Sequence, residues 1–375
     1  MKNFKAGTRI NQGTYRSFQP DLINRPWRLD NTEIQQLLGQ ADRQLGRLDM
    51  YSEYVPNVDL FISMHVLKEA TQSSRIEGTQ TNIEEALLER EDIPPEKRAD
   101  WEEVQNYVAA LNHSIKRLSA LPISSRLIRE AHAILMKGVR GDHKTPGEFR
   151  SSQNWIGGSS IANAVFVPPV HSSVPELMAD LEQFVHNRDV FFPELLRIAL
   201  VHYQFETIHP FLDGNGRVGR LLIPIYLVER EILKRPILYL SDFFERNRAD
   251  YYDSLTAVRE RNDLEHWFKF FLRGVIETAK SGVQTFDNIL TLQKEVEDTI
   301  ATLGVRAARA AKVVKELYVR PLIGAARVAE VAELSPPSAY KLIGDMERLN
   351  ILKEITGGKR GRQFLFARYT RLFNS

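Results

Sequence analysis

The chain has 375 residues, of which 43% are apolar and 26% charged, a balance typical of a folded globular protein. This length predicts two or three domains. The absence of cysteine excludes disulfides, thiolate metal sites and a cysteine nucleophile, and fits a reducing cytosol. We expect neither a signal peptide nor a membrane helix, because no segment has the required apolar run. A cytoplasmic location is therefore the expectation.

Apolar residues recur at helical spacing along most of the chain, which predicts a mainly α fold. The expected helices cover residues 31–48, 60–76, 101–118, 127–136, 174–185 and 193–208, and a helical connector runs from 264 to 303. Residues 154–169 differ, because β-branched and aromatic residues flank a Gly/Ser-rich centre. They predict a β-hairpin that serves as a flap over a site, with a simple surface loop as the alternative.

The carboxyl-terminal part is basic, with 14 Lys and Arg against 6 Asp and Glu from residue 301 onward. Helices are expected at 325–333 and 338–349, followed by two strands within 351–366 around a glycine-rich turn. This order is typical of a winged helix-turn-helix domain. Its basic residues are Lys341 and Arg348 on the second helix and Lys359, Arg360 and Arg362 in the turn. They favour DNA binding, whereas Asp345 and Glu347 on the same helix oppose it, and such domains also dock proteins.

Residues 209–220 read HPFLDGNGRVGR and carry the most informative pattern. Gly214, Gly216 and Gly219 interrupt an apolar helical context at a cost to helix stability, which indicates a need for backbone freedom. A helix that opens beside such glycines presents its first amides to phosphate groups.

The polar side chains of this segment suit phosphate chemistry. Arg217 and Arg220 are three residues apart on one helical face and offer guanidinium donors to phosphate oxygens. Asp213 can hold Mg²⁺, and His209 is a base whose ordinary pKa lies near neutrality. A base, a metal ligand and a phosphate cradle are what phosphoryl-type transfer needs.

The segment matches the Fic family motif, H-P-F-x-[DE]-G-N-G-R-x-x-R, at every fixed position, and residues 122–255 resemble a Fic core. The resemblance implies a protein adenylyltransferase that moves AMP from ATP to a Ser, Thr or Tyr hydroxyl of a target protein or of the chain itself. His209 would deprotonate the hydroxyl, and pyrophosphate would leave. The other implied roles are a Mg²⁺ ligand at Asp213, phosphate contacts at Gly214, Asn215, Gly216, Arg217 and Gly219, and a γ-phosphate clamp at Arg220.

The resemblance extends to three further features. A branch of the family that phosphorylates its targets carries Lys where this chain has Gly216, so Gly216 favours AMP transfer. The flap residues Asn163, Ala164, Val165 and Phe166 would hold the target peptide by strand pairing. Asn247 and Tyr251 would line the adenine pocket, with packing of the tyrosine against the core as the alternative.

Residues 73–78, SSRIEG, match the inhibitory signature of the family, [ST]-x-x-x-E-[GN]. Glu77 falls in the last turn of the expected helix 60–76, before the C-cap Gly78, where a carboxylate disfavours the helix. The resemblance implies that Ser73 opens the signature and that Glu77 pairs with Arg220, which keeps the γ-phosphate out of its productive pose. The same carboxylate could orient a water for the reverse reaction, de-AMPylation.

We expect four regions: an N-terminal helical region with the inhibitory helix (1–110), a Fic core (111–260), a helical connector (261–305) and a winged helix (306–375). One alternative is a nucleotide-sensing, DNA-binding transcription regulator. Another is a metal-dependent phosphohydrolase that uses His202, His209 and Asp213, but the sequence offers no third nitrogen ligand. A homodimer that regulates access to Glu77 is compatible with the sequence.

Overall fold

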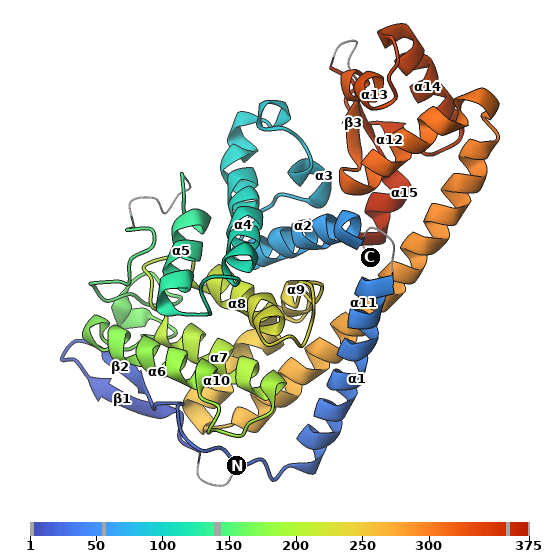
Figure 1. The fold of residues 1–375 in the computed structure, drawn as a ribbon. Helices are drawn as coiled ribbons and strands as arrows, with labels where there is room; N and C mark the ends of the chain where they lie inside the picture. Colours follow the sequence, from blue (N-terminus) through green and yellow to red (C-terminus); the bar gives the residue numbers. More distant parts are fainter. Residues whose placement is uncertain (1–3, 55–57, 139–143, 358–360, 374–375) are drawn as a thin grey trace.

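The computed structural model describes residues 4–54, 58–138, 144–357 and 361–373, and helices dominate it (Figure 1). The mainly α prediction is confirmed. The longer helices are α1 Thr32–Tyr54, α2 Val58–Ile76, α4 Arg98–Arg117, α5 Ser125–Leu135, α6 Val174–His186, α7 Glu194–Ile208, α8 Asn215–Glu229, α10 Arg248–Arg261, α11 Leu264–Ala301, α12 Ala307–Val319 and α14 Pro336–Arg348. The shorter ones are α3 Ile83–Ala86, α9 Ser241–Arg246, α13 Ala325–Val331 and α15 Ala367–Thr370. None of the helices in the described ranges has the length and apolarity needed to cross a membrane.

Helix α7 lies at the centre of the core, packed against α6, α8 and α11. It is buried along almost its whole length, because apolar residues occupy all of its faces. The indole of Trp267 on α11 donates a hydrogen bond to the carbonyl of Ala199 on α7 (2.8 Å). The start of the connector helix is therefore part of the core.

Helix α11 continues as a single helix beyond the core, where the sequence allowed one helix or a pair. Helix α1 runs parallel to it (Figure 1), joined by a hydrogen bond from Asn31 to Glu265 (2.6 Å) near one end and from Tyr51 to Asp287 (2.8 Å) near the other. Between these bonds Gly282 faces Leu48, and a Cβ at residue 282 would lie only 2.9 Å from the leucine side chain. The glycine thus permits close approach of the two helices.

An N-terminal β-hairpin, β1 Gly7–Asn11 and β2 Arg16–Pro20, was not predicted from the sequence. Gly13 at φ +87° provides its turn. The backbone N–H of Phe18 donates to the carbonyl of Val167 (2.9 Å), so the hairpin is attached to the base of the predicted flap.

The flap itself is paired more sparsely than the sequence predicted. Its two arms meet in one antiparallel bridge, between Ile156 and Phe166, and residues 161–163 form a 3₁₀ turn at the tip. The arms therefore form a hairpin-like loop without an extended ladder.

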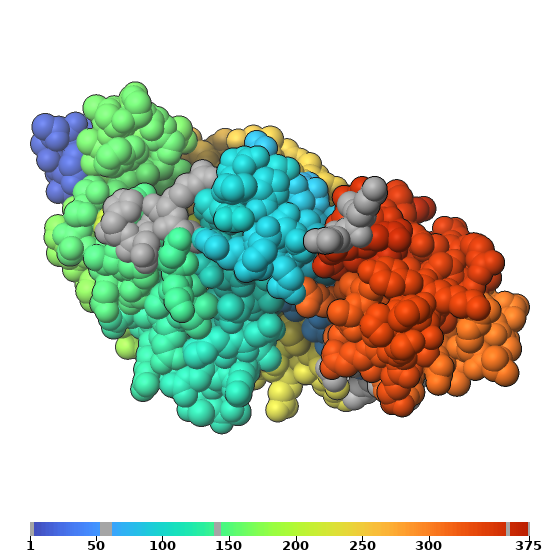
Figure 2. Space-filling view, turned by 90° about the horizontal axis from the view of Figure 1, so that it is seen from above, coloured from blue at the N-terminus to red at the C-terminus, as the bar shows by residue number. Residues whose placement is uncertain are grey.

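The carboxyl-terminal domain contains α12, α13, α14 and an antiparallel sheet in the order β3-β5-β4, with β3 at Leu322–Gly324, β4 at Lys353–Glu354 and β5 at Gln363–Leu365. Helix α12 and strand β3 add to the elements expected. Lys359 and Arg360 lie outside the described residues. The winged-helix assignment and the four domain boundaries stay predictions. In Figure 2 the domain (red) forms one end of the molecule, beside the segment around α3 (cyan).

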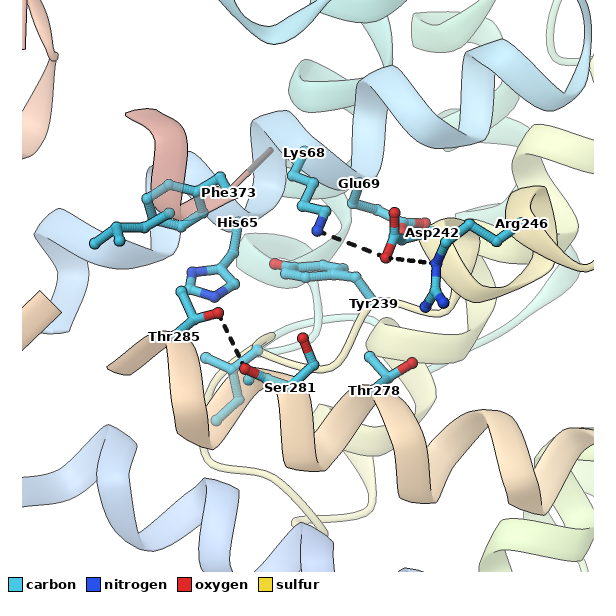
Figure 3. A pocket seen from close by; sticks show the side chains of 13 residues that line it. His65, Lys68, Glu69, Tyr239, Asp242, Arg246, Thr278, Ser281, Thr285 and Phe373 are labelled. Atoms are coloured by element: carbon cyan, nitrogen blue, oxygen red, sulfur yellow. Dashed lines mark hydrogen bonds and ion pairs between the residues drawn. The ribbon is translucent and has the colours of Figure 1, made fainter. Parts of the chain in front are cut away.

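This domain packs directly against α2, the helix that carries the inhibitory signature. The Ser63 hydroxyl donates to the carbonyl of Val319 at the end of α12 (3.2 Å). The ring of Phe373 lies edge-on to His65, with 4.9 Å between centroids. Figure 3 shows the pocket at this junction, in which Asp242 lies between Lys68 and Arg246 (3.6 and 3.4 Å). One face of α2 is therefore covered by the end of the chain.

We expect Phe373→Ala to destabilise the protein by about 3–5 kcal/mol, the usual cost of truncating a buried phenylalanine. Phe373 is 1% exposed, whereas Phe191 is 95% exposed and Phe191→Ala is the matched control. Thermal unfolding of both variants measures the difference. Equal melting temperatures would mean that the chain end does not pack on α2 in solution.

Candidate active site

Segment 209–220 forms the loop between α7 and α8 and the first turns of α8. Helix α7 ends at His209, which has a left-handed backbone (φ +50°), and Gly214 at φ +72° precedes α8. The Asn215 side chain closes the loop: its Oδ1 accepts from the N–H of Phe211 (2.8 Å) and its Nδ2 donates to the Phe211 carbonyl (2.9 Å). Any phosphate contact of Asn215 therefore falls to its backbone amide.

The start of α8 presents backbone amides as the sequence predicted. The first helical hydrogen bond runs from the N–H of Val218 to the carbonyl of Gly214 (3.1 Å). The amides of residues 215–217 precede it and lie at the positive end of the helix dipole. This arrangement can bind an anion such as phosphate.

Arg150 holds the loop in place, a role that the sequence did not indicate. Its Nε donates to the carbonyl of His209 (2.9 Å), and its Nη2 donates to that of Pro169 at the flap base (2.5 Å). Its backbone N–H donates to Pro210 (2.9 Å). Burial lowers the pKa of Arg150 to about 10, so the guanidinium is still charged at neutral pH. One buried arginine thus ties the motif loop to the flap.

His132 on α5 supports the same loop from the other side, although the sequence gave it no role. Its Nδ1 accepts from the N–H of Gly147 (2.8 Å) and its Nε2 donates to the carbonyl of Asp213 (3.1 Å), which sets the neutral tautomer. The ring stacks on Phe211 at 3.7 Å between centroids. Burial lowers the pKa of His132 to about 4.

His209 lies half-buried at the end of α7. Burial, together with the positive charges of Arg259 and Arg150, lowers its pKa to about 4. The imidazole is therefore neutral at physiological pH and can accept a proton.

Asp213 is the residue that could hold a metal. Its carboxylate forms an ion pair with Lys144 (3.1 Å). Burial alone would raise the pKa of Asp213, but Lys144 holds it below the ordinary value. One carboxylate beside a phosphate cradle suits Mg²⁺, which takes its remaining ligands from phosphates and water.

In the described part of the chain no three His, Asp or Glu side chains converge to hold a metal ion. His202 is fully buried, and its ring nitrogens bond to the Gly219 carbonyl (2.9 Å) and to the Tyr251 hydroxyl (2.8 Å). The phosphohydrolase alternative therefore has no ligand set in the described structure.

Arg220 meets the inhibitory signature on α2. Its Nε donates to the Ser73 hydroxyl (2.9 Å), and its Nη2 donates to the Ser73 carbonyl (2.9 Å) and to Glu77 Oε1 (2.7 Å). Gly78 ends α2 with φ +103°. Arg220 is 2% exposed and Glu77 36%.

The ion pair between Glu77 and Arg220 shifts the pKa of both side chains. Burial alone would raise the pKa of Glu77, but Arg220 holds it below the ordinary value. Burial opposes the charge on Arg220 as well, and Glu77 outweighs this and raises the pKa of Arg220. Both groups are thus ionised at neutral pH.

Two of the motif glycines serve close approach rather than backbone freedom, which corrects the reason inferred from the sequence. Only Gly214 among the three has a left-handed backbone. A Cβ at Gly216 would lie 2.3 Å from Glu77 Oε1, and one at Gly219 would lie 2.3 Å from Glu206 Oε1. Each of these two glycines makes room for a carboxylate. Burial raises the pKa of Glu206 to about 7.

The residues expected to bind adenine have other contacts in this structure. Tyr251 is 1% exposed, its ring stacks on Phe244 at 4.5 Å, and its hydroxyl bonds to His202. Asn247 donates through Nδ2 to the carbonyl of Phe243 (2.9 Å) and precedes α10. The core packing that the sequence left open for Tyr251 is present, and the adenine contacts stay a prediction.

The flap residues differ in exposure. Val165 is 74% exposed, while Ala164 is half-buried. Phe166 is buried between Phe18 (5.9 Å) and the guanidinium of Arg259 (4.0 Å). Asn163 turns back to accept from the N–H of Ser160 (2.8 Å). Of these four flap residues, Asn163 and Val165 are exposed.

Models of a known protein family match the sequence of this chain. The Fic/DOC family N-terminal model covers residues 35–116, the Fic/DOC family model covers 122–227, and together they span about half of the chain. The chain belongs to the Fic/DOC family. The motif loop at residues 209–220 lies within the part of the chain that the Fic/DOC family model matches.

Two relatives carry names that bear on activity. The chain is 33% identical over 158 residues to a protein adenylyltransferase Fic from Aedes aegypti. That aligned segment covers 40% of this chain and 29% of the Aedes protein. It is 26% identical over 288 residues to a probable protein adenylyltransferase from Aquifex aeolicus. That aligned segment covers 73% of this chain and 84% of the Aquifex protein. The chain thus spans under a third of the first relative and most of the second.

Solved structures share the fold. A Fic family protein from Desulfovibrio desulfuricans superposes with a TM-score of 0.55 at 19% identity, over 91% of this chain and 98% of that one. Fic-1 from C. elegans superposes with a TM-score of 0.52 at 20% identity, over 70% and 75%. At these identities the likeness shows the fold alone.

We expect acid to destabilise the protein partly through His209. An unfolded histidine titrates near pH 6.5, whereas the pKa of His209 in the fold is about 4. Between these values the unfolded state binds more protons, so the free energy of unfolding falls as the pH is lowered from about 6.5 towards 4. Urea unfolding at several pH values measures this slope.

His209→Asn should reduce the slope, and His266→Asn, at an exposed position on α11, should not. An unchanged slope in His209→Asn would show that the imidazole titrates alike in both states.

Proposed function

We propose that this Fic protein transfers AMP from ATP to a Ser, Thr or Tyr hydroxyl of a target protein and is autoinhibited by Glu77. The observation that carries the proposal is the loop 209–215, which joins a neutral imidazole to the free amides at the start of α8. The adenylyltransferase names of two relatives support the same reaction.

In the proposed reaction His209 takes the proton of the target hydroxyl. The hydroxyl oxygen forms a bond to the α-phosphorus of ATP, while the bond from that phosphorus to the leaving pyrophosphate breaks. The amides of residues 215–217 and the guanidinium of Arg220 bind the phosphates, where fixed donors stabilise the developing charge. Asp213 is the residue that would hold Mg²⁺, which would supply charge neutralisation for the phosphates.

Autoinhibition follows from the competition for Arg220. The guanidinium is buried, already bonded to Ser73 and paired with Glu77. A γ-phosphate that approaches Arg220 must displace the Glu77 carboxylate, because two anions cannot share the same donor and the same space. Glu77 is the more exposed partner and can swing towards solvent. In the reverse reaction the same carboxylate would orient a water for de-AMPylation.

The target peptide would lie along the flap. Backbone pairing with residues 163–166 would place a side-chain hydroxyl near His209, and the exposed Val165 offers an apolar contact. Backbone pairing is indifferent to sequence, so the target's identity rests on other surfaces.

We expect Glu77→Gly to raise ATP-dependent labelling of the chain or of a partner at least tenfold, because an unopposed Arg220 can bind the γ-phosphate. The measurement uses ATP labelled at the α-phosphate, with each other NTP in parallel, and mass spectrometry of the product. His209→Ala in the same background should abolish labelling.

Glu84→Gly, at an exposed glutamate on α3, is the matched control and should leave labelling unchanged. If the product instead carries label from the γ-phosphate, the chain is a kinase and the proposal of AMP transfer is wrong. If Glu77→Gly leaves labelling unchanged while His209→Ala abolishes it, Glu77 is not inhibitory, whereas the catalytic role of His209 stands. If the chain releases AMP from a protein that was labelled with AMP beforehand, it also catalyses the reverse reaction, de-AMPylation.

A second candidate function, DNA binding by the carboxyl-terminal domain, gains support from Asp345. This acidic residue is 2% exposed and pairs with Arg306 and Arg348, so it does not oppose DNA from the surface of α14. The exposed face instead carries Tyr340, Lys341 and Arg348. Their donors and positive charge suit phosphate contacts.

If this face binds DNA, Lys341→Glu should weaken salt-dependent retention on duplex DNA and reduce the salt slope by about one phosphate contact. Lys280→Glu on the exposed side of α11 is the charge-matched control. If Lys341→Glu and Lys280→Glu are retained equally on duplex DNA, the carboxyl-terminal domain docks a protein instead.

A further inference from the structure

Arg217, the first arginine of the motif, already has a carboxylate partner that the sequence did not reveal. Its Nη1 donates to Glu103 Oε2 on α4 (3.1 Å). The two side chains are only 6% and 12% exposed. Glu103 Oε2 also accepts from the hydroxyl of Thr79 (3.0 Å), two residues beyond Glu77. A buried ion pair therefore connects α4, α8 and the turn after the inhibitory helix.

The pair leaves Arg217 with unused donors. A guanidinium has five N–H groups. Glu103 binds one, and the Nη2 faces the sulfur of Met136 at 3.6 Å. The buried Nε has no hydrogen-bond partner in the described structure. An unpartnered, buried donor on a residue in the first turn of α8 is costly unless a ligand completes it.

The two motif arginines have carboxylate partners of different kinds. Glu77 is 36% exposed and can leave Arg220 for water. Glu103 is 12% exposed, and without Arg217 its carboxylate would stay buried with only the Thr79 hydroxyl as a described partner. Breaking a buried pair by moving one partner away is strongly unfavourable. Glu103 is thus a fixed partner, whereas Glu77 is a displaceable one.

We propose that Glu103 is a positioning residue, which holds the Arg217 side chain in place so that its free donors bind a nucleotide phosphate. A fixed arginine loses its rotamer freedom when the protein folds and not when the nucleotide binds. The proposal rests on the proposed function, because it assumes that a nucleotide polyphosphate occupies the amides of α8.

The test uses Glu77→Gly as parent, so that inhibition does not mask binding. Calorimetry with ATP and Mg²⁺ gives the affinity, and labelling kinetics give KM and kcat. We expect Glu103→Ala to weaken ATP binding about tenfold, the scale of a lost hydrogen bond to a charged group. Glu103→Gln keeps an acceptor for both Arg217 and Thr79 and should restore most of the affinity. Thr79→Val keeps the ion pair and should bind ATP as the parent does.

A double-mutant cycle separates positioning from simple structural support. In an Arg217→Ala background, Glu103→Gln and Glu103→Ala should have no further effect on ATP affinity, because the residue acts only through Arg217. A further loss there would overturn the proposal. So would tighter ATP binding in Glu103→Gln or Glu103→Ala than in the parent, which would make Glu103 a second brake.

Calorimetry with ATP also separates the proposal of AMP transfer from the proposal that Glu103 positions Arg217. A parent that binds ATP but labels nothing would overturn AMP transfer and still report on Glu103. If Glu103→Ala does not fold, the comparison of Glu103→Gln with the parent, with and without Arg217, decides the question. A parent that binds no nucleotide would overturn both.

Discussion

The burial of Arg220 is the constraint on which the site depends. A guanidinium that is 2% exposed must have an anion beside it, and in this structure the anion is Glu77, brought in by α2. The position of α2 against the core is therefore linked to the charge of Arg220 through this ion pair. Any ligand that provides a different anion for Arg220 removes the electrostatic reason for Glu77 to stay. In the proposed function Glu77 and the γ-phosphate therefore compete for one donor group, the guanidinium of Arg220.

Helix α2 transmits this coupling to the rest of the molecule. Its last turns carry Ser73 and Glu77 into the site, while Ser63 and His65 contact the end of α12 and Phe373. The pocket in Figure 3 lies along the same helix, between α9, α11 and the end of the chain. The carboxyl-terminal domain and the motif loop thus contact opposite ends of the same helix. A movement of the domain would change the same helix that positions Glu77.

The sequence predicted the parts of the fold that have a periodic signal and the parts of the site that lie in one motif. Helices α1, α2 and α4 to α7 follow from their apolar spacing, and the start of α8 follows from the motif glycines. The contact between Glu77 and Arg220 was expected from the family resemblance, and the structure contains it. Arg150, His132 and Glu103 were missed because each acts through a contact between segments that are distant in sequence. The hairpin β1–β2 was missed as well, because its short strands gain their packing from the flap, a partner that the local sequence does not show.

The glycines of α8 show how a correct signal can have an unexpected cause. Their cost to the helix marked the segment, but at Gly216 the backbone is ordinary and the missing Cβ leaves space for Glu77. A side chain at this position would have to push the carboxylate away from Arg220. The missing side chain at residue 216 is thus a condition for the contact between Glu77 and Arg220.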